Sequence, residues 1–269
     1  MRYLNNEPFL HSSKENIKLY CHKELENESY KEIQNISYDK LKLSSNDLDL
    51  EDIKFSNGIH ALFKVRKLKH RNDRLKATLG IKKQGSHIRS IAEIDNHIKL
   101  LNCQYIPKIL GYGYIYGNLH LARKTLIITE YKEKTYNLKE FIEQFPDKTD
   151  KALELSFNMI KGHLNDGFMH LDIWLGNILI NEDITKTWLI DLEYLKFNSK
   201  RPLEEKLGFC LGYFFLYELS LLISEKKYLT LLNHWLEQHF PKKTLQKISE
   251  HILFYIKNWK IRKERMEFF

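Results

Sequence analysis

The segment 167–193 constrains the fold of this chain more than any other part of its sequence. Two short, mostly apolar runs, 177–180 and 187–190, are separated by the polar stretch 181–185. Short apolar runs joined by a polar turn are typical of a β-hairpin. Such a hairpin would return Asp191, which follows the second run, to the side of the residue that begins the first.

Four polar side chains of this segment form a chemically coherent set. His170 and Asp172 come just before the hairpin, Asn177 begins it and Asp191 follows it. Phosphoryl transfer from ATP needs a carboxylate that orients the acceptor hydroxyl and takes its proton, together with oxygen ligands that hold Mg²⁺ against the phosphates. Asp172 fits the first role, and Asn177 and Asp191 fit the second. We expect His170 to anchor the catalytic loop by hydrogen bonds rather than to transfer protons.

This order of residues resembles the catalytic loop of the protein-kinase-like fold, His-x-Asp-x-x-x-x-Asn, followed by a metal-binding Asp on a later strand. Leu171 occupies the position at which regulated protein kinases usually carry Arg, and 191–193 is Asp-Leu-Glu where they carry Asp-Phe-Gly. No Ala-Pro-Glu follows. These departures point to the small-molecule and sugar kinases of the same fold.

Within that group the chain most resembles the bacterial lipopolysaccharide kinase family, whose members phosphorylate Kdo or heptose of the inner core. Choline and aminoglycoside kinases are also similar, because 190–194 resembles their Ile-Asp-x-Glu-Tyr segment. The resemblance implies ATP and Mg²⁺ as cofactors and a sugar hydroxyl, free or lipid-linked, as the acceptor. Two alternatives of other classes stay open: an inactive pseudokinase scaffold, and an interaction protein that binds anionic membranes.

The resemblance also implies the fold class, an α+β architecture of two lobes with a small β-rich N-lobe and a larger helical C-lobe. It places the N-lobe at 51–133 and the C-lobe at 134–269. The polar segment 1–50 is expected to be an N-terminal extension without chemistry of its own. A chain of 269 residues, 43% of them hydrophobic, is long enough for both lobes.

A hairpin is predicted over 52–68, where Asn57 and Gly58 separate two apolar runs. In the kinase-like fold the first hairpin covers the ATP phosphates with a glycine-rich loop. The resemblance assigns Gly58 to that cover. A plain hairpin explains a single glycine equally well.

The run 77–83 resembles the strand whose lysine touches the nucleotide phosphates. Alternation along a strand would place Gly80 and Lys82 on one face. A small residue two positions before the lysine leaves room for adenine. Lys82 is therefore preferred to Lys83 as the phosphate-binding lysine.

A helix is predicted over 86–102, because isoleucines and leucines recur there at helical spacing and Ser86 can cap its start. In this fold the helix carries an acid that orients the lysine. Glu93 is the expected partner of Lys82, and Asp95 is the alternative.

The apolar run that ends at Tyr131 is expected to lead into the hinge between the lobes. There the backbone groups of Glu130 to Lys132 would hydrogen-bond adenine, whatever their side chains. A helix predicted over 149–166 then delivers the chain to the catalytic loop.

Composition narrows the environment and the partners. A net charge of +8 and a pI near 9.1 favour anionic partners, whereas no aromatic RNA-binding motif supports nucleic acid. Three scattered cysteines favour a reducing compartment, and the start of the chain lacks the apolar core of a secretion signal. The most apolar run, 207–223, is interrupted by Glu218 and is expected to be a buried helix. The prediction is a cytoplasmic protein.

The tail 252–265 interleaves aromatic and basic residues. This pattern fits peripheral contact with the anionic surface of the inner membrane, which would suit a lipid-linked acceptor. It equally fits a helix that closes the larger lobe.

Overall fold

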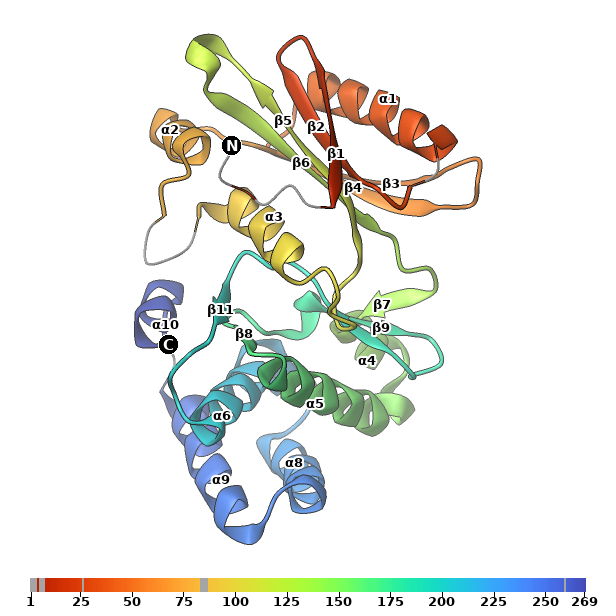
Figure 1. Ribbon diagram of the computed structural model, residues 1–269. Coiled ribbons are helices and arrows are strands. Elements are labelled where there is room, and N and C mark those ends of the chain that lie inside the picture. The colour runs from red at the N-terminus through yellow and green to blue at the C-terminus, as the bar shows by residue number, and fades with distance from the viewer. Residues whose placement is uncertain (1–3, 5–7, 26, 83–86, 259) are drawn as a thin grey trace. The chain divides into compact units, whose positions relative to one another are not determined.

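The computed structural model describes the chain except for residues 1–3, 5–7, 26, 83–86 and 259 (Figure 1). The chain divides into two compact units, and each is described by itself. Residues 1–102 with 107–132 form the first unit, and residues 103–106 with 133–269 form the second. The first is an antiparallel sheet with helices and the second is mainly helical, so the fold class is α+β.

The first unit is built on one antiparallel sheet with the strand order β1-β2-β5-β6-β4-β3. Its strands are β1 (Phe9–Lys14), β2 (Ile17–His22), β3 (Leu48–Lys54), β4 (His60–Lys67), β5 (Ile109–Tyr116) and β6 (Ala122–Glu130). Its helices are α1 (Asn27–Leu43), α2 (Arg71–Leu79), α3 (Arg89–Lys99) and the short 3₁₀ helix η1 (Asn118–His120).

Alternation along the strands sends side chains into two apolar layers, one on each face of this sheet. Leu126 and Ile128 of β6 belong to the layer that α1 closes with Leu41. Ile127, between them, belongs to the layer that α3 closes with Ile94. The helices α1 and α3 therefore cover opposite faces of the sheet (Figure 1).

The first 50 residues are part of this unit, which corrects the expected N-terminal extension. Strand β2 pairs with β5, with Leu19 opposite Gly113, and β1 adds the edge strand. On α1, Ile33 and Leu41 are fully buried. The composition is polar because an edge hairpin and a one-sided helix keep one face in water, so low average hydrophobicity did not reveal their core positions.

The predicted hairpin over 52–68 is confirmed as β3 and β4, which pair antiparallel from Leu48 opposite Arg66 to Lys54 opposite His60. The N–H of Phe55 donates to the carbonyl of Ile59 (2.8 Å) where the turn closes.

The predicted strand over 77–83 is wrong for 77–82, the part that the structure describes. Residues 77–79 are the last turn of α2, and Gly80 ends that helix in the left-handed conformation (φ 71°), with its N–H donating to the carbonyl of Lys76. Glycine is favoured at this position because it has no Cβ to clash. The alternation that suggested a strand placed Leu79 and Ile81 on its apolar face, and both side chains are exposed.

The predicted helix over 86–102 is present as α3, which is shorter and begins at Arg89 after Ile88 in extended conformation. The expected cap, Ser86, lies outside the described residues. Its apolar positions are buried as expected, including Ile91, Ile94 and Ile98.

The second unit holds two small sheets, with strand order β10-β9-β7 and β11-β8, among its helices. Its strands are β7 (Thr135–Asn137), β8 (Phe168–His170), β9 (Ile178–Asn181), β10 (Thr187–Leu189) and β11 (Leu195–Phe197). Its α-helices are α4 (Leu138–Gln144), α5 (Thr149–Asn165), α6 (Leu203–Phe214), α7 (Ser220–Leu222), α8 (Glu225–His239), α9 (Lys242–Lys257) and α10 (Arg262–Phe268). Three short helices are η2 (Pro146–Lys148), η3 (Leu175–Asn177) and the π-helical η4 (Phe215–Leu219).

Helix α5 lies at the centre of this unit's core and confirms the predicted helix over 149–166. Phe157 packs against Phe214 of α6 and against Tyr228 and Trp235 of α8. The apolar run 207–223 forms α6, η4 and α7, and α6 is buried from Leu207 to Phe214. Among the residues that the structure describes, no helix is both long enough and apolar enough to cross a membrane.

Candidate functional site

The loop that follows β8 in the second unit carries the first of the predicted site residues. Strand β8 is buried and pairs with β11, with His170 opposite Leu195. The N–H of Leu171 donates to the carbonyl of Tyr194 (2.9 Å) and extends this pairing. The N–H of Asp172 donates to Nδ1 of His170 (3.2 Å), so the histidine makes the loop hydrogen bond that its expected anchoring role requires.

Asn177 closes the same loop. Its Nδ2 donates to the backbone carbonyl of Asp172 (2.9 Å), and its backbone N–H donates to the carbonyl of Trp174 (3.0 Å). Both Asp172 and Asn177 are buried. Because the amide nitrogen of Asn177 serves the loop, its side-chain oxygen is the atom suited to accept or to bind a cation.

The hairpin predicted over 177–190 is confirmed. Strands β9 and β10 pair with Ile178 opposite Leu189, and the N–H of Ile190 donates to the carbonyl of Asn177 (3.0 Å). Asp191 follows directly, with a left-handed backbone (φ 57°). That conformation is uncommon outside glycine, and Asp and Asn adopt it more readily than most residues. The second unit therefore brings Asp172, Asn177 and Asp191 to one loop and its adjoining hairpin end.

Two buried histidines lie on the elements that precede this loop, His170 at the end of β8 and His163 on α5. Burial lowers the pKa of His170, and the carboxylates of Asp172 and Asp191 oppose that shift. Nδ1 of His163, on α5, donates to the carbonyl of Phe168 (3.1 Å), and burial lowers the pKa of His163 to about 3. His163 is accordingly neutral at neutral pH, which suits a buried structural imidazole.

Arg265 contacts the loop and was not predicted from the sequence. It lies on α10, and its Nη1 donates to the carbonyl of Leu171 and lies 3.2 Å from Oδ1 of Asp172. The two side chains are 2% and 8% exposed. The tail was expected either to contact a membrane surface or to close the larger lobe, and the burial of Arg265, Met266 and Phe269 fits the second alternative.

In the first unit the lysine that pairs with Glu93 is Lys64, not Lys82. Lys64 lies on β4 and its Nζ is 2.8 Å from Oε1 of Glu93 on α3, with the side chains 15% and 5% exposed. Lys82 is exposed just beyond α2, and Lys83 lies outside the described residues. The alternative partner, Asp95, pairs with Lys99 (2.7 Å).

The pattern of β4 could have revealed Lys64. Ala61, Phe63 and Val65 are buried on one face, which leaves Lys64 on the other face, where α3 packs. Burial, and to a smaller extent the nearby ammonium of Lys64, lower the pKa of His97 to about 3. The requirement for a small residue two positions before the lysine misled the prediction, because Leu62 occupies that position.

The expected hinge residues already use part of their backbone within the first unit. The N–H of Glu130 donates to the carbonyl of Lys108 (2.8 Å), and the N–H of Tyr131 donates to that of His60 (2.9 Å). Nζ of Lys132 lies 2.6 Å from Oε2 of Glu130. These two N–H groups are therefore not available to adenine. The backbone groups that remain for the expected contacts are the carbonyls of Glu130 and Tyr131 and the backbone of Lys132.

Gly58 lies in the turn between β3 and β4. It has φ 86°, and a Cβ placed there would meet no atom within 4 Å. Its N–H donates to the carbonyl of Phe55 (3.0 Å). The turn itself thus requires a glycine-like backbone, so a plain hairpin accounts for Gly58 without a ligand.

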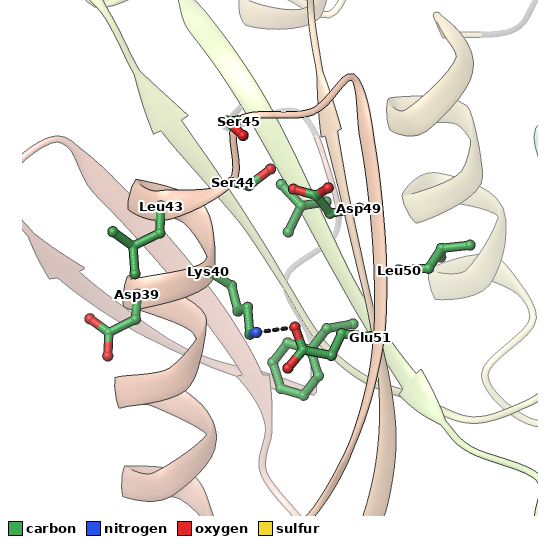
Figure 2. Close-up of a pocket in the computed structure, with 10 residues that line it drawn as sticks. Asp39, Lys40, Leu43, Ser44, Ser45, Asp49, Leu50 and Glu51 are labelled. Carbon is green, nitrogen blue, oxygen red and sulfur yellow. Dashed lines mark hydrogen bonds and ion pairs between the residues drawn. The ribbon is translucent and has the colours of Figure 1, made fainter.

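Three surface hollows of the first unit lie apart from Lys64 and Glu93. Figure 2 shows one of about 370 Å³, where Lys40 of α1 pairs with Glu51 of β3 beside Asp39 and Asp49. Two others, of about 380 and 350 Å³, share Arg74 and Arg123 and have more basic than acidic lining residues, with Asp47 as the acid. Their basic lining residues are Arg71, Arg74, Arg123, Lys67, Lys69 and Lys124. Part of the positive charge of the chain is concentrated there.

No protein-family model matches the chain, and no curated protein matches it significantly.

Proposed function

We propose that the chain is an ATP- and Mg²⁺-dependent phosphotransferase of the protein-kinase-like fold, with an alcohol group as acceptor. One observation carries the proposal: Asp172, Asn177 and Asp191 lie on one hydrogen-bonded loop and its adjoining hairpin end. A carboxylate and two further oxygen donors are the groups that phosphoryl transfer needs.

The donor set fits Mg²⁺. This ion prefers oxygen ligands and is commonly bound through one or two carboxylates together with substrate phosphates. Asn177 offers a side-chain oxygen, because its nitrogen donates to the loop, and Asp191 offers a carboxylate. When bound, the ion would neutralise charge on the phosphates. Asp172 would orient the acceptor hydroxyl and take its proton.

Lys64 replaces Lys82 in the proposed nucleotide-binding set. A lysine that touches phosphates must present its ammonium in a fixed position, and the ion pair with Glu93 fixes Lys64. Lys82 is exposed and lies on no strand or helix, and no ion pair to it is found among the residues that the structure describes.

The acceptor is proposed to be a sugar hydroxyl of the lipopolysaccharide inner core, Kdo or heptose. The family resemblance suggests it, and charge favours it over choline or an aminoglycoside. Both alternatives are cations and would need acidic groups, whereas the loop after β11 carries Lys200 and Arg201 and the chain has a net charge of +8. An enzyme of this kind would work in the cytoplasm, at the inner membrane if its acceptor is lipid-linked.

The experiment is a thermal unfolding series with ATP and Mg²⁺. A ligand that binds only the folded chain stabilises it by about 2.7 kcal/mol at a concentration 100 times its Kd. We expect a Mg²⁺-dependent rise in Tm that Asp191→Ala abolishes and that Asp183→Ala retains, since Asp183 is an exposed acid in the turn of the same hairpin. No rise for the wild-type chain would contradict the nucleotide site.

Transfer is then measured on a panel of Kdo-lipid, heptose, choline and aminoglycoside acceptors. Asp172→Ala should abolish transfer without removing the Mg²⁺-dependent rise in Tm. Nucleotide binding without transfer to any acceptor would favour the pseudokinase alternative.

A further inference from the structure

We infer that Arg265, on the last helix, is a positioning residue for Asp172, so that α10 is part of the catalytic machinery. This inference rests on the proposed function. It adds a residue that lies 93 positions away in the sequence from the carboxylate it contacts.

Arg265 contacts two groups of the loop. The same nitrogen, Nη1, donates to the carbonyl of Leu171 and approaches Oδ1 of Asp172 at 3.2 Å. One contact is to the backbone just before the proposed base, and the other is to the base itself. Together they restrain both the position of the loop and the rotation of the carboxylate.

Further contacts within the second unit fix the guanidinium and the helix that carries it. Its Cζ lies 4.3 Å from the ring centroid of Tyr213 on α6. Helix α10 is fixed at its far end, because Arg201 stacks on the ring of Phe268 (4.1 Å) and donates to its carbonyl (3.3 Å). Phe269 packs on Phe209 of α6 (4.6 Å between ring centroids). Arg265 is therefore seated rigidly rather than resting on the surface.

Stability alone is a weak reason for this arrangement. Removing two charges from water costs about as much as their attraction returns, so a buried ion pair contributes little net stability compared with apolar residues. The pair is found at the one carboxylate that the chemistry needs in a fixed orientation. A general base works only within hydrogen-bond reach of the hydroxyl, and a displacement of about 1 Å can cost about 100-fold in rate.

The test compares Arg265→Met and Arg265→Lys with a matched control, Lys263→Met. Lys263 lies on the same helix, is 67% exposed and pairs only loosely with Glu267 (3.8 Å). The readouts are phosphate release from ATP without an acceptor, which needs no knowledge of the substrate, and the Mg²⁺-ATP-dependent rise in Tm.

We expect Arg265→Met to lower kcat by about 10-fold or more, while the KM for ATP and the nucleotide-dependent rise in Tm change little. Arg265→Lys should recover part of the loss, because the cation is retained without the planar fork. Lys263→Met should match the wild type.

Three outcomes would overturn the inference, and they separate its failure from the failure of the proposed function. A kcat of Arg265→Met close to that of the wild type would refute the positioning role and leave the proposed function intact. Equal loss of kcat and of nucleotide binding in both Arg265 variants would make the residue structural. The absence of both phosphate release and transfer to any acceptor of the panel by the wild-type chain would remove the proposed function, and the inference with it.

Discussion

The ion pair between Lys64 and Glu93 gives the sharpest test of the nucleotide-binding unit. Its Nζ to Oε1 distance of 2.8 Å and the low exposure of both side chains place it among nearly buried pairs. Lys64→Met removes the cation and keeps an unbranched side chain of similar length. Glu93→Gln removes the opposite charge and keeps the shape.

This geometry gives the expected loss in the free energy of unfolding when one partner is removed. At an effective dielectric constant of about 20, charges 2.8 Å apart attract by about 6 kcal/mol, and desolvation offsets part of that. Removing one partner of a buried pair typically costs about 3–5 kcal/mol, because the other charge stays buried. Lys64 keeps some contact with water, so we expect about 3 kcal/mol for Lys64→Met. The double variant should lose less than the sum of the two single variants, with a coupling of about 2 kcal/mol.

The assay is urea unfolding of the full chain, followed by fluorescence and circular dichroism. Lys82→Met is the matched control, and an exposed residue of this kind should change the free energy of unfolding by less than about 0.5 kcal/mol. The Mg²⁺-ATP-dependent rise in Tm should be lost in Lys64→Met and kept in Lys82→Met. Equal effects of the two variants, or additive effects of the Lys64 and Glu93 changes, would refute the reasoning.

Two further predictions concern stability. The folded chain keeps His97 and His163 neutral, with pKa values near 3, whereas the unfolded chain takes up protons on them near the ordinary histidine pKa of about 6.5. The stability that comes from keeping these two histidines neutral is therefore fully present above that pH, and it is lost as the pH falls toward 3. It declines by about 1.4 kcal/mol per histidine between about pH 7.5 and about pH 5.5. Urea midpoints at the two pH values check this, and an unchanged midpoint contradicts it. Gly208→Ala would place a methyl group against Cβ of His251 where α6 crosses α9, and should cost about 2 kcal/mol. Lys247→Ala, at an exposed position of α9, should cost little in the same measurement.

Local patterns in the sequence were sufficient for several elements. The hairpin over 177–190, the hairpin over 52–68 and the helix α5 were all predicted correctly. Each depends on contacts between residues close together in the chain, so turn residues and apolar spacing specify it. The same local order placed Asn177 beside the residue before Asp191, because a hairpin register leaves little freedom.

Long-range pairing decided the rest. Lys64 and Glu93 are 29 positions apart in the sequence, and Arg265 and Asp172 are 93 apart. No local spacing of residues predicts either pair. The first 50 residues likewise show their core positions only when β2 pairs with β5.

The physical reason is that a charged side chain has no period of its own. An apolar residue is placed by burial, which repeats along a strand or helix, whereas a lysine or an arginine is placed by whichever opposite charge the folded chain brings within reach. The sequence by itself determined the hairpins over 52–68 and 177–190, the helices α3 and α5 and the polar residues of the loop. Only the tertiary structure decided which cations those residues meet.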